Sequence, residues 1–393
     1  MRLFFILASF VCIAFAGARG ATPLPSTGRG WGWGEGTSGI DPGKFEPLLP
    51  SPTLRPAAIN HQKPACCVTP TPYPSPQGGG DSELAQKIAL GANLFSDPRL
   101  SKDGTMSCAS CHDPKQAFTN PKPPVRPGVT DNRLRRDIPS LLNVAFFAPL
   151  HHDGGEPTLE MQILAPLFNE AEMANTTFDE LTNRLAAIPE YREAFATVFR
   201  SAPTIETLGQ ALAAYERSLL AADSPFDRWR FAHNDDAVSL DAKTGFGLYG
   251  GKAGCSQCHT LGETAAPFTT NVFLNTGIGY QSEARRAAET PNALADRGRE
   301  EVTHSRDDRY KFRTPTLRNV ELTAPYMHDG SLKTLEDVVA YYNAGGSSDP
   351  DKDPRISPLG LSETEQKELV AFLKSLTAKE MPGAQPGIHT PKP

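Results

Sequence analysis

The stretch Cys108-Ala109-Ser110-Cys111-His112 (CASCH) recurs later in the chain as Cys255-Ser256-Gln257-Cys258-His259 (CSQCH). Both copies have the pattern Cys-x-x-Cys-His, which is the attachment signature of a c-type haem. Two thiols about one helical turn apart can reach the two vinyl groups of one porphyrin, and the adjacent histidine then faces the iron. Zinc and dithiol redox sites also use Cys-x-x-Cys, but two copies that each end in histidine favour haem. We therefore expect two covalently bound haems, one on Cys108, Cys111 and His112 and one on Cys255, Cys258 and His259.

The composition and the first residues indicate an exported protein. The chain has 393 residues and a formal net charge of −6. No block of Lys or Arg stands out, so a nucleic-acid partner is not expected. The start, MRLFFILASFVCIAFAGARGA, has a charged residue, an apolar run and small residues at a cleavage position, which is typical of a signal peptide over residues 1–18. The apolar run is short for a membrane span, so we expect export to the periplasm without stable membrane insertion, with an uncleaved anchor as the alternative.

The pattern along the chain divides it into segments. Residues 19–80 are rich in Pro and Gly and have little apolar periodicity, which predicts a flexible lead-in. Order is expected to begin near Ser82, a candidate helix cap ahead of apolar residues at helical spacing. We expect a first domain over 81–235 that holds the first haem and a second domain over 236–380 that holds the second, followed by a tail over 381–393.

Helical patterns surround both haem motifs. The segment before each motif repeats the same theme, in which Lys87, Leu90-Gly91 and Phe95 correspond to Lys243, Phe246-Gly247 and Tyr249. Between the motifs, TIETLGQALAAYERSLL has an apolar stripe at helical spacing, formed by Leu208, Leu212, Tyr215 and Leu219. Near the end, Ser362 and Glu365 form a capping box at the start of SETEQKELVAFLKSL. Helices separated by Gly/Pro loops, without alternating strands, predict a mostly α fold with two cytochrome c-like haem domains packed side by side.

The two haems are expected to differ at their second axial face. An electron-transfer haem has a protein ligand on both faces of the iron, whereas a reactive haem keeps one face open. Between Asp113 and Val144 the sequence has no His and no Met, so the segment after the first motif supplies no sixth ligand. The remaining alternatives are more distant side chains, namely His151, His152 and Met161.

Four further segments carry a resemblance to a known family. They are LGANLFSDPRLSKDGTMSCASCHDPKQAFTN, DIPSLLNVAFF, PTLEMQILAPLFNEAEM and KFRTPTLRNVELTAPYMHDGSLKTLEDVVAYYNAGG. Together they resemble the bacterial di-haem cytochrome c peroxidase family, and within it the MauG-like branch. The resemblance implies a periplasmic enzyme that reduces hydrogen peroxide with electrons from a small redox protein, such as a cytochrome c or a cupredoxin. The alternatives are MauG-like oxidation of aromatic residues in a partner protein and a non-enzymatic di-haem electron carrier.

The resemblance also implies roles for side chains at the first haem. The family places a Gln and a Glu at the open face, and this sequence has Gln162 and Glu172 at the matching spacing. Peroxide must lose a proton from one oxygen and gain one on the other before the O–O bond breaks, and a Glu can carry that proton. The alternative for Glu172 is a solvated helix-capping acid, which is the expectation for Glu170. The family's switchable His and inter-haem Trp are replaced here by Gly128 and His152.

At the second haem, the family's sixth ligand is Met in the peroxidases and Tyr in the MauG-like branch. The matching position is Tyr342. Helical spacing places Tyr342 with Val339 on the apolar face, unlike Tyr341. From the residues alone, Met327 and His328 are the alternatives. A phenolate ligand stabilises Fe(III) and higher states, so the resemblance implies a second haem that holds oxidising equivalents.

The family also has a calcium ion between the haems. The resemblance maps its ligands to Asp137, where an Asn is usual, and to the backbone carbonyls of Thr323 and Pro325. Ligation by oxygen atoms alone, completed by several waters, suits Ca²⁺. We therefore expect one calcium ion in addition to the two haems.

Overall fold

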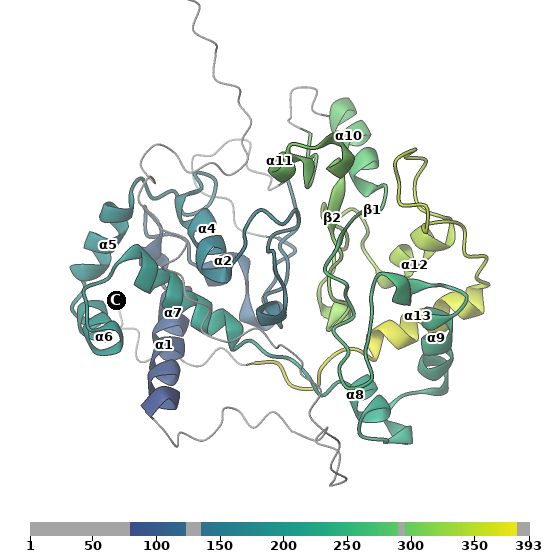
Figure 1. The fold of residues 1–393 in the computed structure, drawn as a ribbon, viewed down its shortest axis with the longest axis horizontal. Coiled ribbons are helices and arrows are strands. Elements are labelled where there is room, and N and C mark those ends of the chain that lie inside the picture. The colour runs from purple at the N-terminus through teal and green to yellow at the C-terminus, as the bar shows by residue number, and fades with distance from the viewer. Residues whose placement is uncertain (1–78, 123–134, 290–294, 383–393) are drawn as a thin grey trace, which may run out of the picture.

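The computed structural model of the protein describes residues 79–122, 135–289 and 295–382. The predicted signal peptide, nearly all of the lead-in, Gly128 and most of the tail lie outside the described residues. Within them, helices dominate and the strands form a small two-stranded antiparallel sheet (Figure 1). The predicted mostly α fold is therefore confirmed. None of the described helices is long and apolar enough to cross a membrane.

The elements follow one another in two groups along the chain. The first group comprises α1 Gly79–Phe95, η2 Pro98–Leu100, α2 Cys108–Cys111, η3 Pro114–Gln116, η4 Val144–Phe146, α3 Leu159–Gln162, α4 Leu164–Phe168, α5 Phe178–Ala186, α6 Pro189–Phe199 and α7 Ile205–Arg217. The second comprises α8 Pro225–Arg230, η5 Asp235–Ala237, α9 Leu240–Gly250, η6 Cys255–Gln257, β1 Phe273–Asn275, α10 Ile278–Glu289, α11 Glu300–Thr303, η7 Arg306–Asp308, β2 Lys311–Arg313, η8 Val320–Leu322, α12 Leu335–Asn343 and α13 Glu363–Lys374.

The first group of elements packs around one cluster of buried apolar side chains. Helices α1 and α7 lie side by side in its centre (Figure 1). They approach closely at Gly91, where an added Cβ would lie 2.0 Å from the carbonyl oxygen of Ala211, so only glycine fits this crossing. One turn later, Phe95 packs against Phe118 and Tyr215, with ring centroids 6.1 and 5.1 Å away. The predicted stripe of the α7 segment belongs to this cluster and is buried.

The second group of elements repeats this arrangement around its own apolar cluster. Helices α9 and α13 cross at Gly245, where an added Cβ would lie 2.0 Å from the carbonyl oxygen of Glu368. Tyr249 packs one turn later against Phe372, with ring centroids 4.9 Å apart. Phe226, from α8, extends the same aromatic cluster and is fully buried. Each haem motif therefore follows a helix that is held by a glycine crossing.

The two crossings show the register of the internal duplication. Gly91 corresponds to Gly245, and the aromatic residue four positions later is Phe95 in one copy and Tyr249 in the other. The predicted pairing of Gly91 with Gly247 is wrong by two residues, because a Cβ at Gly247 would meet nothing within 4 Å. The predicted pairing of Lys87 with Lys243, which lie four residues before Gly91 and Gly247, is therefore also wrong by two residues.

The sequence predicted caps at the starts of two helices, Ser362 before α13 and Ser82 before α1. The capping box at α13 is confirmed, since the Glu365 N–H donates to the Ser362 hydroxyl at 3.3 Å and the Ser362 N–H donates to Glu365 Oε2 at 2.7 Å. The expected cap at Ser82 is wrong. Helix α1 begins at Gly79, so Ser82 lies inside the helix, whereas an N-cap residue precedes the first helical residue.

The small sheet and buried ion pairs connect the two groups of elements. Strand β1 pairs with β2, and the Arg313 N–H of β2 donates to the carbonyl oxygen of His152 at 2.7 Å. Nearby, the Arg136 guanidinium lies 2.5 Å from a carboxylate oxygen of Asp153 and 2.7 Å from one of Asp296. All three side chains are largely buried, and the Arg136 charge holds the pKa of both carboxyl groups below its usual range. The junction between the groups is thus a polar, hydrogen-bonded layer.

Candidate active site

The first Cys-x-x-Cys-His motif forms a single helical turn. Helix α2 begins after Ser107, whose N–H donates to the hydroxyl of Ser110 at 3.0 Å. The turn places Cys108 and Cys111 one above the other, and both are half-buried free thiols. His112 ends the turn, and its N–H donates to the Cys108 carbonyl at 2.8 Å. The local geometry therefore presents two thiols and an imidazole on one side of the turn.

Both motif histidines are held in the tautomer that a haem iron needs. His112 Nδ1 lies 3.0 Å from the Phe118 carbonyl oxygen, and His259 Nδ1 lies 3.0 Å from that of Phe268 and 3.1 Å from that of Pro315. A carbonyl only accepts, so each Nδ1 carries the proton and each Nε2 keeps its lone pair. Burial lowers the pKa of both imidazoles and keeps them neutral. This is the usual way in which a metal-binding histidine is oriented.

The second motif has the same components in a slightly different turn. Cys255 opens η6, and the His259 N–H donates to the Cys255 carbonyl at 3.0 Å. Cys255 and Cys258 are half-buried free thiols, and burial raises the pKa of Cys255 to about 11. The Tyr249 hydroxyl donates to the carbonyl of His259, which connects the motif to the α9–α13 aromatic cluster. The donor set of each motif, two unpaired thiols and one neutral imidazole, fits a c-type haem.

Glu172 lies next to the first motif. It follows α4, in a turn where its N–H donates to the Asn169 carbonyl at 3.0 Å and the Asn169 amide donates to its Oε1 at 2.5 Å. Burial raises the pKa of Glu172. Burial, followed by the Glu172 charge, raises the pKa of the Cys111 thiol to about 11, so the carboxylate lies within electrostatic range of this motif. Glu172 caps no helix, since α5 begins only at Phe178, and the helix-capping alternative is wrong. Gln162 is half-buried at the last position of α3.

The two adjacent tyrosines of α12 have different surroundings. The Tyr341 hydroxyl donates to the Thr276 carbonyl at 2.8 Å. The Tyr342 hydroxyl has no hydrogen bond to any described residue. Burial, and then Tyr341, Cys255 and Cys258, raise the pKa of Tyr342, so its ring lies in the electrostatic neighbourhood of the second motif. The two rings meet edge to face, with centroids 5.4 Å apart.

Met327 and His328, the alternatives to Tyr342, lie in a turn before α12. Met327 has a φ of 71°, and its carbonyl accepts from the Gly330 N–H at 3.3 Å. The buried His328 ring stacks on Phe312 of β2, with ring centroids 3.6 Å apart.

Two of the three residues expected to bind calcium, Asp137 and Pro325, lie beside Gly330. A Cβ added to Gly330 would lie 3.1 Å from Pro325 Cγ and 3.8 Å from Asp137 Cβ. Burial raises the pKa of Asp137 to about 7, and the charge of Lys333 opposes this only in part. None of the described residues donates a hydrogen bond to the carbonyl of Thr323 or Pro325. A half-buried carboxyl that forms no ion pair with the described residues, together with two carbonyls that accept no hydrogen bond from them, is a donor set that fits Ca²⁺.

His152, at the position of the family's inter-haem Trp, points toward this region. Its Nε2 lies 3.0 Å from the Asp137 carbonyl oxygen and therefore donates to it. Burial, followed by the Arg136 charge, lowers the pKa of His152 to about 3, so the ring is neutral. Of the other distant candidates for the first iron, His151 has a φ of 64°, and Met161 packs against the first apolar cluster.

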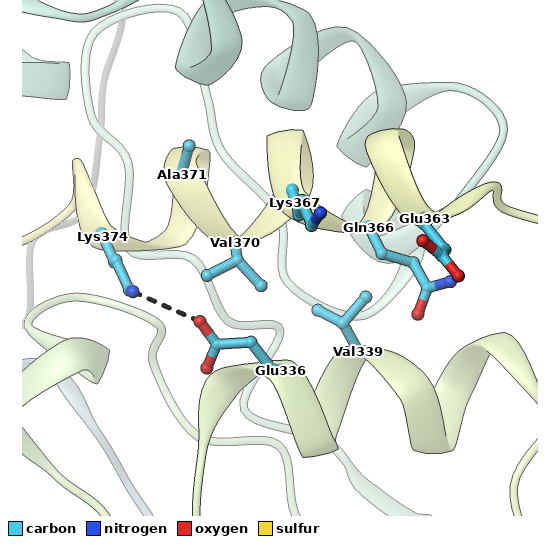
Figure 2. A pocket seen from close by; sticks show the side chains of 8 residues that line it. All are labelled: Glu336, Val339, Glu363, Gln366, Lys367, Val370, Ala371 and Lys374. Atoms are coloured by element: carbon cyan, nitrogen blue, oxygen red, sulfur yellow. Dashed lines mark hydrogen bonds and ion pairs between the residues drawn. The ribbon is translucent and has the colours of Figure 1, made fainter.

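A groove of about 440 Å³ lies between α12 and α13 (Figure 2). Val339 and Val370 form part of its floor, and an ion pair of 3.3 Å joins Lys374 to Glu336 across it. None of the described residues predicted for the haems or for calcium lines this groove. It is therefore separate from the candidate active site.

The sequence did not predict the groups that orient the motif histidines and Glu172. The carbonyls of Phe118, Phe268 and Pro315 hold the motif histidines, and Asn169 holds Glu172. A carbonyl is present at every residue, so its use leaves no signal in the sequence. Asn169, in contrast, lies only three residues before Glu172, and an Asn in a short turn is a readable signal.

Comparisons with known proteins agree with this geometry. The sequence model of a family described as "Di-haem cytochrome c peroxidase" matches residues 85–236. The chain is 36% identical to the methylamine utilization protein MauG of Methylorubrum extorquens, over 75% of this chain and 79% of that protein. It is 37% identical to the cytochrome-c peroxidase IdrP1 of Denitromonas iodatirespirans, over 86% and 88% of the two chains. Among solved structures, a MauG-like protein associated with microbial copper homeostasis is 31% identical and superimposes with a TM-score of 0.65, covering 82% of this chain and 96% of that one.

Proposed function

The chain belongs to the di-haem cytochrome c peroxidase family, and from this premise we propose that it reduces hydrogen peroxide to water at a first haem on His112. The observation that carries the proposal is the half-buried Glu172, whose carboxyl group is fixed by Asn169 within electrostatic range of the first motif. The overall reaction takes two electrons and two protons per peroxide. Bound haem supplies the iron that cleaves the O–O bond and stores the resulting oxidising equivalents.

The proposed attachment is covalent at both motifs. Each pair of free thiols would form thioether bonds to one porphyrin, and each neutral imidazole would offer Nε2 to one iron. The two apolar clusters would then form the walls of two cytochrome c-like domains, which we propose over 81–235 and 236–380. Helix α8 is the exception to these bounds, because its Phe226 packs in the second cluster. The repeated glycine crossings support this division, because each haem motif follows the first helix of an equivalent crossing pair.

Glu172 and Gln162 are proposed to act on peroxide at the first haem. Glu172 takes a proton from one peroxide oxygen and returns it to the other, and its raised pKa suits a group that must both accept and release a proton. Asn169 fixes the carboxylate through a hydrogen bond of 2.5 Å. Gln162 orients the peroxide by hydrogen bonding from the end of α3.

Tyr342 is proposed as the second axial ligand of the haem on His259. Its hydroxyl, free of hydrogen bonds to the described residues, is near Cys255 and Cys258, whereas the Tyr341 hydroxyl is occupied by Thr276. A tyrosine ligand stabilises oxidised iron, so this haem holds oxidising equivalents until a reductant arrives. The calcium ion, on Asp137, Thr323 and Pro325, is proposed to rigidify the polar junction between the two haems.

The electron donor is proposed to be a small redox protein, a cytochrome c or a cupredoxin, in the periplasm. The amino-terminal signal pattern supports the location. The tyrosine at the ligand position favours one second candidate, oxidation of aromatic residues in a partner protein, because a relative of this chain is named as MauG. An electron-carrier function alone is not proposed, since the family consists of oxidoreductases.

Rapid mixing of the full-length, haem-loaded protein with peroxide tests the proposed function. The haem absorbance is expected to change within milliseconds, and a reduced small cytochrome c is then expected to be oxidised with two equivalents per peroxide. Oxidation of the cytochrome without peroxide dependence would contradict a peroxidase. Spectral change with peroxide, but no oxidation of cytochrome c or cupredoxin, would support the second candidate instead.

A further inference from the structure

Glu216 is a buried acid within electrostatic range of the first haem motif, and the proposed reaction does not use it. It lies on α7 with only 5% of its surface exposed, and its Oε2 has no hydrogen-bond partner among the described residues. Buried polar atoms in native proteins are nearly always paired, so an unpaired carboxylate oxygen requires an explanation.

The nearest cation does not neutralise Glu216. Arg217 directs its guanidinium to Glu160, with 2.5 Å from Nη1 to Oε1 and 2.9 Å from Nη2 to Oε2. Glu160, on α3, is fully buried, so this bidentate pair occupies Arg217. The guanidinium is thus paired with Glu160, and the negative charge of Glu216 is left over whenever both carboxyl groups are ionised. Burial, with Glu160 acting in the same direction and Arg217 opposing it, raises the pKa of Glu216 to about 8.

The Glu216 charge reaches the cysteine that would carry the first haem. After burial itself, its charge is the largest influence that raises the pKa of the Cys108 thiol, ahead of those of Cys111 and Glu172. The charged and titratable groups around Glu216 are therefore Arg217 on its own helix, Glu160 on α3 and Cys108 on α2. A porphyrin bound to Cys108 would lie within the electrostatic reach of this carboxyl group.

We propose that Glu216 is a proton-binding group of the first haem site, which gains a proton when the haem is reduced and loses it when the haem is oxidised. This inference rests on the proposed attachment of the first haem to Cys108. In the step, one electron from the donor reduces the iron and one proton from solvent converts the Glu216 carboxylate to the acid, so charge and atoms balance. An added electron close to a buried carboxylate makes the ionised form less favourable, and the coupling is reciprocal.

The coupling has a consequence for the reaction. Reduction of peroxide to water consumes two protons, and Glu172 moves a proton between the peroxide oxygens without supplying additional ones. A proton stored on Glu216 during reduction is already inside the protein when peroxide arrives. Glu216 therefore differs from Glu172 in role, because it would compensate charge at the first haem site and would not act on peroxide.

The midpoint potentials of both haems, measured as a function of pH in the full-length haem-loaded protein, test this inference. Between about pH 6 and pH 9, the equilibrium constant for reducing the first haem should fall by up to about tenfold per pH unit. In Glu216→Gln this dependence should be lost, while the second haem, in the same sample, serves as the internal control. An unchanged pH dependence in Glu216→Gln would overturn the inference. A lost dependence together with an intact reaction with peroxide would separate this result from a failure of the proposed function.

Two further variants keep the test decisive if Glu216→Gln loads haem poorly. Glu160→Gln should release Arg217 to pair with Glu216, so the pH dependence of the first haem should move to lower pH. A shift to higher pH, or no shift, would contradict the inference. Glu172→Gln should keep the pH dependence, because Glu172 acts on peroxide. If Glu172→Gln abolishes the dependence, the proton-binding group is Glu172 and the assignment to Glu216 is wrong.

Discussion

The side-chain amide of Asn169 donates a hydrogen bond to the Glu172 carboxylate, with 2.5 Å between Nδ2 and Oε1. The bond favours the ionised form of Glu172, while burial favours the protonated form, and burial has the larger effect on its pKa. The result is a carboxyl group that is fixed in position and whose pKa is higher than that of an exposed glutamate. These are the two properties that a proton shuttle needs.

Replacing Glu172 by Gln should slow the reaction of the haem with peroxide by roughly two to four orders of magnitude. The amide keeps the size of the side chain but cannot accept a proton from peroxide. Stopped-flow absorbance at the haem band measures the rate, and the haem content should remain normal. Glu170→Gln is the matched control, since Glu170 lies on the exposed side of the same turn and should react as fast as the wild type. Equal rates in Glu172→Gln and wild type would assign the shuttle to another residue.

The pH dependence of the same rate should respond to Asn169. Glu172 must be ionised to take a proton, so the rate falls as pH drops through its pKa, which burial places above that of an ordinary glutamate. Asn169→Ala removes a hydrogen bond to the carboxylate and should raise this pKa further. The acid limb of the rate profile should therefore move to higher pH in the variant. A limb that stays in place, or moves to lower pH, would contradict the role of Asn169.

The sequence predicted those features of the site that depend on short spacing. The Cys-x-x-Cys-His motifs, the capping box at Ser362 and the separation of Gln162 from Glu172 are local patterns, and their residues can be read directly. The register of the duplication could not be read, because Gly245 and Gly247 differ only in which helix face they present to α13. The contact with the Glu368 carbonyl that distinguishes them comes from a segment far along the chain.

The charged groups near the first haem motif show the same limit. Glu216 has no motif of its own in the sequence and stands on a helix that was identified only by its apolar stripe. Its burial, and the pairing of Arg217 with Glu160 on another helix, arise from tertiary packing. Sequence patterns identify the residues of a helix that face the core, but they do not show which buried acid lacks a partner.

Cys108→Ala should leave the first haem without one thioether bond, and Cys255→Ala should do the same at the second. We expect each single variant to lose covalent haem at its own site and to retain the other haem. The mass of the mature protein after acid denaturation measures this directly, and the wild type should carry two haems. A wild-type mass with only one haem would exclude the two-site assignment, whatever the variants show.

Gly245→Ala should lower the free energy of unfolding of the second group of elements, which carries the second haem motif, by about 1 to 3 kcal/mol. The added Cβ would lie 2.0 Å from the Glu368 carbonyl, so α9 and α13 would have to move apart. Gly247→Ala is the control on the same helix, since its Cβ would meet nothing within 4 Å. There the higher helix propensity of Ala should raise the free energy of unfolding by up to about 1 kcal/mol. Chemical unfolding, followed by circular dichroism, gives both values, and equal effects at the two glycines would contradict the crossing.

Tyr342→Phe should open the second iron and raise its midpoint potential. The phenolate that we propose as its ligand is an anionic oxygen donor, which stabilises the ferric state, and phenylalanine offers no donor atom. Tyr341→Phe is the matched control on the adjacent position of α12. It removes only the hydrogen bond to the Thr276 carbonyl and should leave the spectrum of the six-coordinate haem unchanged.

Met327→Leu decides between the two branches of the family. Met327 lies in a turn with a φ of 71°, and its substitution should change neither the spectrum nor the potential of the second haem if Tyr342 is the ligand. A thioether ligand has the opposite effect on potential from a phenolate, because it favours Fe(II). If Met327→Leu removes the sixth ligand and Tyr342→Phe does not, the ligand is Met327. The second haem would then be a high-potential electron acceptor, and the chain would resemble the peroxidases that draw electrons from a small donor protein more closely than the MauG-like branch.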